Sequence, residues 1–352
     1  MEYKTIRDIK FKGQTILVRV DYNVPIKDGK ITDDLRIRAS LPTLEFLREG
    51  GAKKIILISH LGRPEGRDKS LSLKPVAEAL KKMLPDVNFI DDVSGPDVEE
   101  AVARLKDGGI LLLENLRFYS GEEENSEEFI REIIESTSAE IYVQDGFAVV
   151  HRAHASTEAA ASHLPVYAGL LLEKEIKNLE RAIKNPARPL LLIIGGAKVD
   201  DKKPLIDKFI KFADQVVVGG KIAADGYSAS SKVYVAEDFD EDGEGARLDV
   251  GPISTAKISG FITDAKTIIW NGLMGKAEDP AYATASTIIA EMLGEKEDAE
   301  TLVCGGDTTG FVENLVKKHP NLKYSLISTG GGAALEFLLG KELPGLAVIE
   351  KR

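Results

Sequence analysis

Charged and polar side chains follow the apolar, strand-length runs in the first half of the chain. Guanidinium groups bind carboxylate and phosphate oxygens through paired hydrogen bonds, so arginines gathered at one sheet edge suit a small phosphorylated acid. Arg36 can join them from the start of a helix. A set of unrelated surface arginines is the alternative interpretation. The side chains that follow these runs are Asp21, Asn23, His60, Arg63, Arg117, Asp145, His151, Arg152 and His154.

Glycines take the same positions in the second half of the chain. Each glycine turn opens a helix, and the free N–H groups and positive dipole end of a helix N-terminus suit phosphate oxygens, so we predict a nucleotide polyphosphate site. Asp307 is placed to hold Mg²⁺, which favours carboxylate and phosphate oxygens. A helix-capping role is the alternative for Thr308 or Thr309. The turns are Gly195-Gly196, Gly219-Gly220, Gly305-Gly306 and Gly330-Gly331-Gly332.

Two lysines follow the first of these turns. Lys198 and Lys202 are four residues apart at the start of a predicted helix, a spacing that puts both ammonium groups on one face. Both can reach a phosphoryl group in transfer. An exposed pair of like charges is the alternative interpretation.

The elements that carry these residues alternate between strand and helix patterns. Continuous apolar strands between amphipathic helices predict parallel sheets covered on both faces, with ligands at the carboxyl ends of the strands. The predicted strands are 16–20, 54–59, 110–113, 140–144, 190–195, 215–219, 266–270, 301–305 and 324–328. The predicted helices are 35–50, 73–84, 97–106, 126–136, 169–184, 200–213, 282–293 and 309–319.

The alternation breaks after Pro165, where one long amphipathic helix precedes Asn185-Pro186. We therefore predict an α/β chain with two doubly wound, Rossmann-like parallel-sheet domains joined by a hinge helix. The first domain covers residues 1–168, the connecting helix 169–186, and the second domain 187–341.

Composition excludes several classes of protein. The 352 residues are 43% hydrophobic and 29% charged with a formal net charge of −11, which predicts a globular chain without a nucleic-acid or membrane surface. Residues 1–80 nevertheless carry 16 basic and 11 acidic side chains. The N-terminus has no secretory pattern and Cys304 is alone, so we expect a cytoplasmic protein with this cysteine in its core.

Several common signatures are missing from the sequence. There is no Walker P-loop, no dinucleotide-binding glycine motif with an acid downstream, and no protein-kinase catalytic loop. The histidines lack the spacing of a strong zinc site. Three acidic stretches are predicted to be solvated turns: 91–92, 122–124 and 238–244.

Ten motifs in order resemble the phosphoglycerate kinase family, from residue 16 to about 340. They are VRVDYNVP, ITDDLRIRASLPT, SHLGRP, LLLENLRF, HRAH, GGAKVDDK, LDVGP, WNGLMG, CGGDTTG and STGGGAALEFL. The resemblance implies a two-lobed, hinge-bending enzyme that transfers a phosphoryl group between 1,3-bisphosphoglycerate and MgADP, giving 3-phosphoglycerate and MgATP.

The resemblance also implies roles for individual residues. The substrate contacts are Asp21, Asn23, Arg36, His60, Arg63, Arg117 and Arg152, of which His60 either binds the substrate carboxylate or orders the Arg63 loop. The nucleotide contacts are Gly195, Lys198, Lys202, Glu278, Gly305, Gly306, Asp307 and Thr308, with Asp307 on Mg²⁺. The catalytic groups are Arg36, Lys198, Gly306 and Gly331. The tail 342–352 is expected to pack on the first domain, and the protein is expected to be a monomer.

The chain departs from the family around the nucleotide base. The stretch between Gly226 and Arg247 is shorter than usual, Arg247 stands where the family tends to have glycine, and WNGLMGKAE replaces the commoner WNGPMGVFE. The choice between ATP and GTP is therefore open. Two other functions also stay open: a nucleotide-dependent kinase for another small carboxylate, and a non-catalytic protein that binds nucleotide or phospho-acid.

Overall fold

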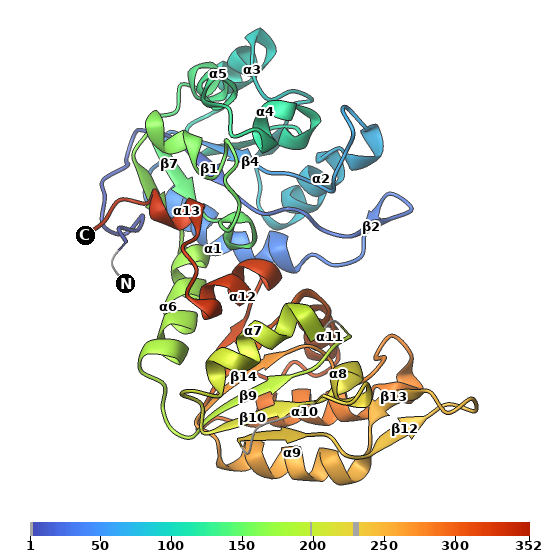
Figure 1. Cartoon of the computed structure of the whole chain (residues 1–352). Coiled ribbons are helices and arrows are strands. Elements are labelled where there is room, and N and C mark those ends of the chain that lie inside the picture. The colour runs from blue at the N-terminus through green and yellow to red at the C-terminus, as the bar shows by residue number, and fades with distance from the viewer. Residues whose placement is uncertain (1–2, 198, 228–231) are drawn as a thin grey trace. The chain divides into compact units, whose positions relative to one another are not determined.

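A computed structural model describes residues 3–197, 199–227 and 232–352 of the chain. Within them the chain forms two compact units, one of Met1–Ile176 with Glu342–Arg352 and the other of Lys177–Lys341. In Figure 1 the first unit runs from blue to green and ends with the red tail, and the second runs from yellow-green to orange-red. The division falls inside helix α6 (Leu170–Lys184).

The first unit is built on a six-stranded parallel sheet with the strand order β5-β6-β4-β1-β7-β8. All residues of β1 and β7 are buried, as expected for strands covered by helices on both faces. The strands are β1 (Thr15–Arg19), β4 (Lys54–Ile58), β5 (Val87–Phe89), β6 (Gly109–Leu112), β7 (Ile141–Gln144) and β8 (Val166–Ala168). A small hairpin, β2 (Ile26–Lys27) and β3 (Lys30–Ile31), follows β1.

Helices connect the strands of this first sheet. Each long helix buries an apolar stripe, such as Val76, Ala77 and Leu80 of α2, and exposes its charged face. The helices are α1 (Leu35–Glu49), α2 (Lys74–Met83), α3 (Pro96–Arg104), α4 (Ser120–Glu123), α5 (Glu127–Thr137) and, in the tail, α13 (Pro344–Ala347).

The second unit has its own six-stranded parallel sheet, with the order β11-β10-β9-β14-β15-β16. Numbered along this unit, the order is 3-2-1-4-5-6, that of the Rossmann fold, in which ligands bind where the winding reverses, here between β9 and β14. The strands are β9 (Leu190–Ile194), β10 (Gln215–Val218), β11 (Val233–Val235), β14 (Thr267–Asn271), β15 (Glu300–Cys304) and β16 (Leu326–Ile327).

The helices of the second unit are α7 (Val199–Phe209), α8 (Gly220–Ala224), α9 (Pro252–Asp264), α10 (Thr284–Glu295), α11 (Gly306–Lys318) and α12 (Gly331–Leu339). An antiparallel hairpin outside the sheet joins β12 (Phe239–Glu241) to β13 (Arg247–Val250). Figure 1 shows this hairpin projecting beside α8.

The start of α6 is fixed by a buried carboxylate. Asp145, directly after β7, accepts hydrogen bonds from the N–H groups of Leu171 and Leu172 at 3.0 and 3.3 Å. Burial raises the pKa of Asp145 to about 7. A side chain at Gly169 would collide with this carboxylate. The connecting helix therefore begins where a strand end of the first unit supplies its cap.

The tail returns to the first unit. The Gly345 N–H donates to the Val150 carbonyl at 2.9 Å, and the Lys4 N–H donates to the Glu350 carbonyl at 2.7 Å. Tyr3 forms an isolated bridge with Lys351. The two ends of the chain thus lie side by side.

The α/β class with two parallel sheets is confirmed, and so is each strand predicted from an apolar run. The short edge strands β5, β8 and β11 and helix α9 were not predicted, because three-residue strands carry little pattern. Cys304 is buried, as expected. Among the described residues, no helix has both the length and the apolar character needed to cross a bilayer.

Two of the predicted solvated turns differ in part from the prediction, although Glu123, Glu124 and Glu244 are exposed as expected. Glu122 is completely buried at the end of α4. In the stretch 238–244, Asp238 accepts hydrogen bonds from the N–H groups of Ile253 and Ser254 and so caps α9, and the next residues form strand β12. Burial or capping of a charged residue depends on distant segments, which local composition does not report.

Candidate active site

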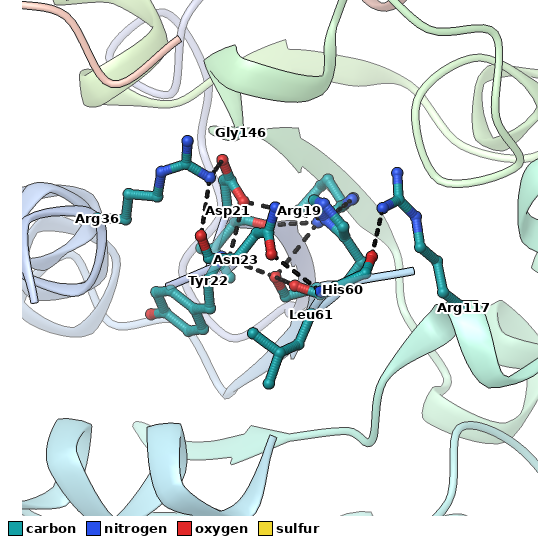
Figure 2. Close-up of polar contacts among 12 residues, drawn as sticks. Arg19, Asp21, Tyr22, Asn23, Arg36, His60, Leu61, Arg117 and Gly146 are labelled. Carbon is teal, nitrogen blue, oxygen red and sulfur yellow. Dashed lines mark hydrogen bonds and ion pairs between the residues drawn. The ribbon is translucent and has the colours of Figure 1, made fainter. Parts of the chain in front are cut away.

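The first candidate region is a polar cluster at the carboxyl ends of β1 and β4, here called the basic edge: Asp21, Asn23, Arg36, His60, Arg117 and Arg152. Arg36 Nη1 lies 2.7 Å from Asp21 Oδ2 and 3.1 Å from the Asn23 carbonyl oxygen. The Asn23 side chain accepts the Gly62 N–H at 2.9 Å. Figure 2 shows Arg36 of α1 directed toward Asp21 and Asn23 of the segment after β1. Their orientation is therefore fixed before any ligand binds.

His60 is buried and neutral. Burial, and then the positive charges of Arg19, Arg117, Arg36 and Arg152, hold the pKa of His60 well below its usual value. Arg19 Nη2 lies 3.0 Å from His60 Nδ1. Because arginine can only donate, Nδ1 accepts and the ring proton is on Nε2. His60 is thus a fixed neutral donor among cations.

The basic edge rests on a buried ion cluster that sequence reasoning missed. Arg19, inside β1, donates to Ser156 Oγ at 2.7 Å, and its Nη2 lies 3.9 Å from Glu122 Oε1. Glu122 in turn accepts the Ser156 hydroxyl and N–H at 2.6 and 3.0 Å. The segment that carries Arg152 is anchored in this way. The sequence offered one signal for this ion cluster: Arg19 is a charged residue inside the apolar run ILVRV.

His154 lies beside the same cluster. Burial, followed by the charges of Arg117 and Arg152, lowers the pKa of His154 to about 4. Its Nδ1 is 3.8 Å from Glu122 Oε1, but the neutral ring makes this a dipolar contact and not an ion pair. His154 therefore adds a polar but uncharged ring to the basic edge.

The remaining arginines differ in placement. Arg117 is buried, donates to the Gly62 carbonyl at 2.6 Å and pairs with Glu123 at 3.2 Å. Its pKa falls to about 10, through burial first and neighbouring arginines second. Arg152 is half-buried and acts on the pKa values of Arg117, His60 and His154. Arg63 is exposed and makes no hydrogen bond or ion pair with the cluster in the described parts of the chain.

The second candidate region lies at the carboxyl ends of β9, β14 and β15, here called the glycine edge: Gly195, Gly196, Gly220, Gly272, Gly305, Gly306 and Gly331. The backbones of neighbouring loops lie so close together here that a side chain on either loop would collide with the other. A Cβ on Gly195 would lie 2.2 Å from the Leu273 carbonyl oxygen, and one on Gly272, where φ is +103°, would lie 2.1 Å from the Gly195 oxygen. These glycines bring neighbouring loops together, and the N–H groups of Gly195, Gly196 and Gly272 donate to acceptors within those loops and α11.

Two helix N-termini meet at this edge. A Cβ on Gly331, at the start of α12, would lie 3.0 Å from the Gly306 nitrogen at the start of α11. Gly306 itself has open space where its Cβ would be. The paired N-termini concentrate N–H donors and positive dipole ends, which suits a polyphosphate.

Thr308 and Thr309 do not cap α11. The Thr308 hydroxyl accepts the Gly272 N–H at 2.8 Å, and the Thr309 hydroxyl donates to the Ser328 carbonyl at 3.2 Å. The cap position is Gly305, which has no side chain to donate or accept. Thr308 therefore ties the turn after β14 to α11, and the free N–H groups of α11 stay available.

A pocket of about 490 Å³ opens at the glycine edge. Lys202 donates to the Asn271 side-chain oxygen inside it. The buried Asn271 amide nitrogen has no hydrogen-bond partner among the described residues. Asn271, at the end of β14, was not predicted from the sequence. Lys198 lies outside the described residues.

Asp307 and Glu278 complete the acidic side of this pocket. Both are exposed and line it. The Asp307 carboxylate has no ion pair or hydrogen bond among the described residues. No group of at least three histidine, cysteine or carboxylate side chains that could hold a metal by itself occurs among those residues. Mg²⁺ commonly binds one or two carboxylates together with substrate phosphates, and Asp307 fits that pattern.

A Rossmann-ordered sheet with a glycine-lined pocket, on one chain with an arginine-rich edge, is the arrangement expected of a phosphotransferase. The phosphoglycerate kinase family model matches residues 6–230 and 222–341. The chain belongs to the phosphoglycerate kinase family. It is a kinase of glycolysis whose phosphoryl acceptor is a carboxyl group.

Named relatives agree along the whole chain. A phosphoglycerate kinase of Dictyoglomus turgidum is 39% identical over 404 aligned positions that cover 100% of each chain. The solved phosphoglycerate kinase structure from Coxiella burnetii matches with a TM-score of 0.80 at 32% identity, over 98% of each chain. That from Pyrococcus horikoshii OT3 matches with a TM-score of 0.87 at 28% identity, also over 98% of each chain.

Proposed function

We propose that the basic edge binds 3-phosphoglycerate or 1,3-bisphosphoglycerate, that the glycine edge binds MgADP or MgATP, and that the phosphoryl group passes directly between them. The observation that carries this assignment is the pairing of unlike sites on one chain. One is an electropositive cluster of arginine side chains, and the other is a pocket of backbone donors with an unpartnered Asn271 amide.

The acid is held by charge and by fixed donors. Arg36 and Arg117 are oriented by protein oxygens, so little side-chain entropy is lost when they bind an anion. Neutral His60 offers the Nε2–H without adding charge. These groups orient the substrate carboxylate and phosphate; no side-chain nucleophile is required, because phosphoryl transfer depends on positioning and on charge stabilisation.

The nucleotide is held by backbone. N–H groups at the starts of α11 and α12, with Lys202 and Asn271, face the phosphates, and Asp307 would hold Mg²⁺ together with the phosphate oxygens. The bound ion would offset phosphate charge. Arg36, Gly306 and Gly331 would stabilise the charge on the transferring group, and Lys198 would join them on the sequence resemblance alone.

Because acceptor and donor are assigned to different units, the proposal includes closure of one unit on the other when both ligands bind, which also excludes water. Small-angle X-ray scattering tests this part. The radius of gyration should fall with 3-phosphoglycerate and MgADP together, but not with either ligand alone.

The activity test incubates the protein with MgATP, 3-phosphoglycerate and hydroxylamine, which traps the acyl phosphate as a hydroxamate. Hydroxamate should form only with 3-phosphoglycerate and Mg²⁺ present, and it should be lost in both Arg36→Ala and Lys202→Ala. Arg104→Ala, an exposed arginine on α3, is the control. Hydroxamate from another small carboxylate in preference to 3-phosphoglycerate would contradict the substrate assignment.

A further inference from the structure

One end of the glycine-edge pocket is built by the β12–β13 hairpin. Phe239 from β12, Arg247 and Leu248 from β13, and Lys276 from the loop after β14 line it. The family model matches the chain in two segments, 6–230 and 222–341, which overlap just before this hairpin. Arg247 stands where the family tends to have glycine, so its side chain is the departure in this part of the wall.

The two ends of the pocket suit different parts of a nucleotide. Glycines and helix N-termini at the ends of β9 and β15 suit phosphate, whereas Phe239 and Leu248 offer aromatic and apolar surface. A base is flat and mostly apolar on its faces, so it belongs against the hairpin. This placement rests on the function proposed above.

Arg247 is held in a defined orientation at the base end. Its guanidinium lies over the Phe239 ring, 5.1 Å from the centroid, and its Nη1 donates to the Ala224 carbonyl at 3.2 Å. Its Nε is 3.6 Å from a Glu241 carboxylate oxygen. The other guanidinium N–H groups have no protein partner in the described residues. Arg247 thus lines the pocket in a defined orientation and keeps guanidinium donors without a protein partner among the described residues.

A second cation at this end strengthens the donor character. Lys276 is exposed, and its ammonium makes no hydrogen bond or close ion pair among the residues described, although its charge acts on the carboxylate of Asp242. Lys221, which also lines the pocket, is paired with Asp225 at 3.0 Å. Arginine and lysine side chains are hydrogen-bond donors only, so the free groups at the base end can bind only hydrogen-bond acceptors.

Purine bases differ in what they present to such donors. Guanine and hypoxanthine carry O6 and N7 as adjacent acceptors, which match an arginine fork, whereas adenine presents an N6 amino donor beside N7. We propose that Arg247 is a specificity-determining residue that binds the O6/N7 edge of the base, so that this chain prefers guanine and hypoxanthine nucleotides to adenine nucleotides. Adenine nucleotides bind through the same phosphate contacts but lack the contact between Arg247 and the base.

The test compares GTP, ITP and ATP as phosphoryl donors to 3-phosphoglycerate. The kcat/KM for GTP and for ITP should exceed that for ATP on the order of 10-fold. ITP lacks the 2-amino group of GTP but keeps O6 and N7. A kcat/KM for ITP equal to that for ATP would therefore overturn the proposal that Arg247 binds the O6/N7 edge. An ATP value equal to or above that of GTP would overturn the proposal outright.

The variant Arg247→Gln sharpens the test, because glutamine matches the N6/N7 edge of adenine. The GTP-to-ATP ratio should fall on the order of 10-fold, with the KM for 3-phosphoglycerate unchanged. Arg188→Gln is the matched control: Arg188 and Arg247 are each 49% exposed, and Arg188 also donates to a carbonyl and pairs with a carboxylate, Asp214, away from the pocket. An unchanged ratio in Arg247→Gln would overturn the role of this residue.

Calorimetric binding of GDP, IDP and ADP separates this inference from the proposed function. Tighter GDP and IDP binding that depends on Arg247, without phosphoryl transfer, would support base recognition and refute the reaction. Transfer to 3-phosphoglycerate with no base preference in binding would support the reaction and refute the base recognition.

Discussion

The basic edge and the glycine edge recognise anions by opposite means. At the basic edge long charged side chains converge, and buried Glu122 pairs with buried Arg19 beneath them. At the glycine edge side chains are absent, and the backbone itself approaches closely enough to form the site. Buried charge is costly unless it is paired, whereas open N–H groups at a helix start need no counter-ion. The basic edge therefore depends on the carboxylate of Glu122, which is distant in the sequence, and the glycine edge depends on the absence of Cβ atoms.

The largest effect is expected from Glu122→Gln. Arg19 would stay buried without its carboxylate, and breaking a buried pair costs about 3–5 kcal/mol of unfolding free energy. Denaturant unfolding measures the loss. Glu124→Gln, two positions on and exposed, is the control. Unchanged stability in Glu122→Gln would show that the basic edge does not depend on this pair.

Arg36→Ala should reduce kcat/KM by the equivalent of about 3 kcal/mol, by analogy with the loss of one oxyanion donor. Steady-state kinetics in both substrates measure it. MgADP binding, followed by calorimetry, should be unchanged, because Arg36 belongs to the basic edge alone. A loss of nucleotide affinity would contradict the separation of the two edges.

Gly306→Ala tests the glycine edge without disturbing the fold. Both Gly306 and Gly310 of α11 have open space at the Cβ position, so neither alanine should lower stability. A methyl group at Gly306 blocks the approach of phosphate to the helix start, and the nucleotide KM should rise about 10-fold, or about 1.4 kcal/mol. Gly310→Ala, one turn later, should leave the KM unchanged. Equal KM values in the two variants would refute the phosphate site.

The smallest effect concerns pH. Because the pKa of His154 falls to about 4 in the folded state, the unfolded chain binds more protons as pH drops below the ordinary value. His154 should therefore cost about 1 kcal/mol of stability between pH 6.5 and 5.5. The difference in unfolding free energy between the wild type and His154→Gln should change by that amount. A difference independent of pH would show that burial and the cations at the basic edge do not suppress protonation of His154.

The sequence was sufficient for the placement of most site residues. In a parallel sheet the residues after each strand reach the same edge, so the apolar runs followed by Asp21 and by His60 predicted neighbours that are far apart in the chain. Asn271 was missed although it directly follows a predicted strand, because Lys202 donates to its oxygen and its amide nitrogen has no partner only in the folded structure.

By itself the sequence determined the α/β class, the sheet-forming runs and the two anion-binding chemistries, because these follow from local periodicity and from the residue that ends each strand. Only the tertiary structure decided that Glu122 is buried under the basic edge and that Arg247 lies over Phe239 at the pocket wall. The placement of each residue depends on contacts between segments that are distant in the sequence. Without these contacts, a glutamate or an arginine in such a stretch is predicted to lie on the solvated surface.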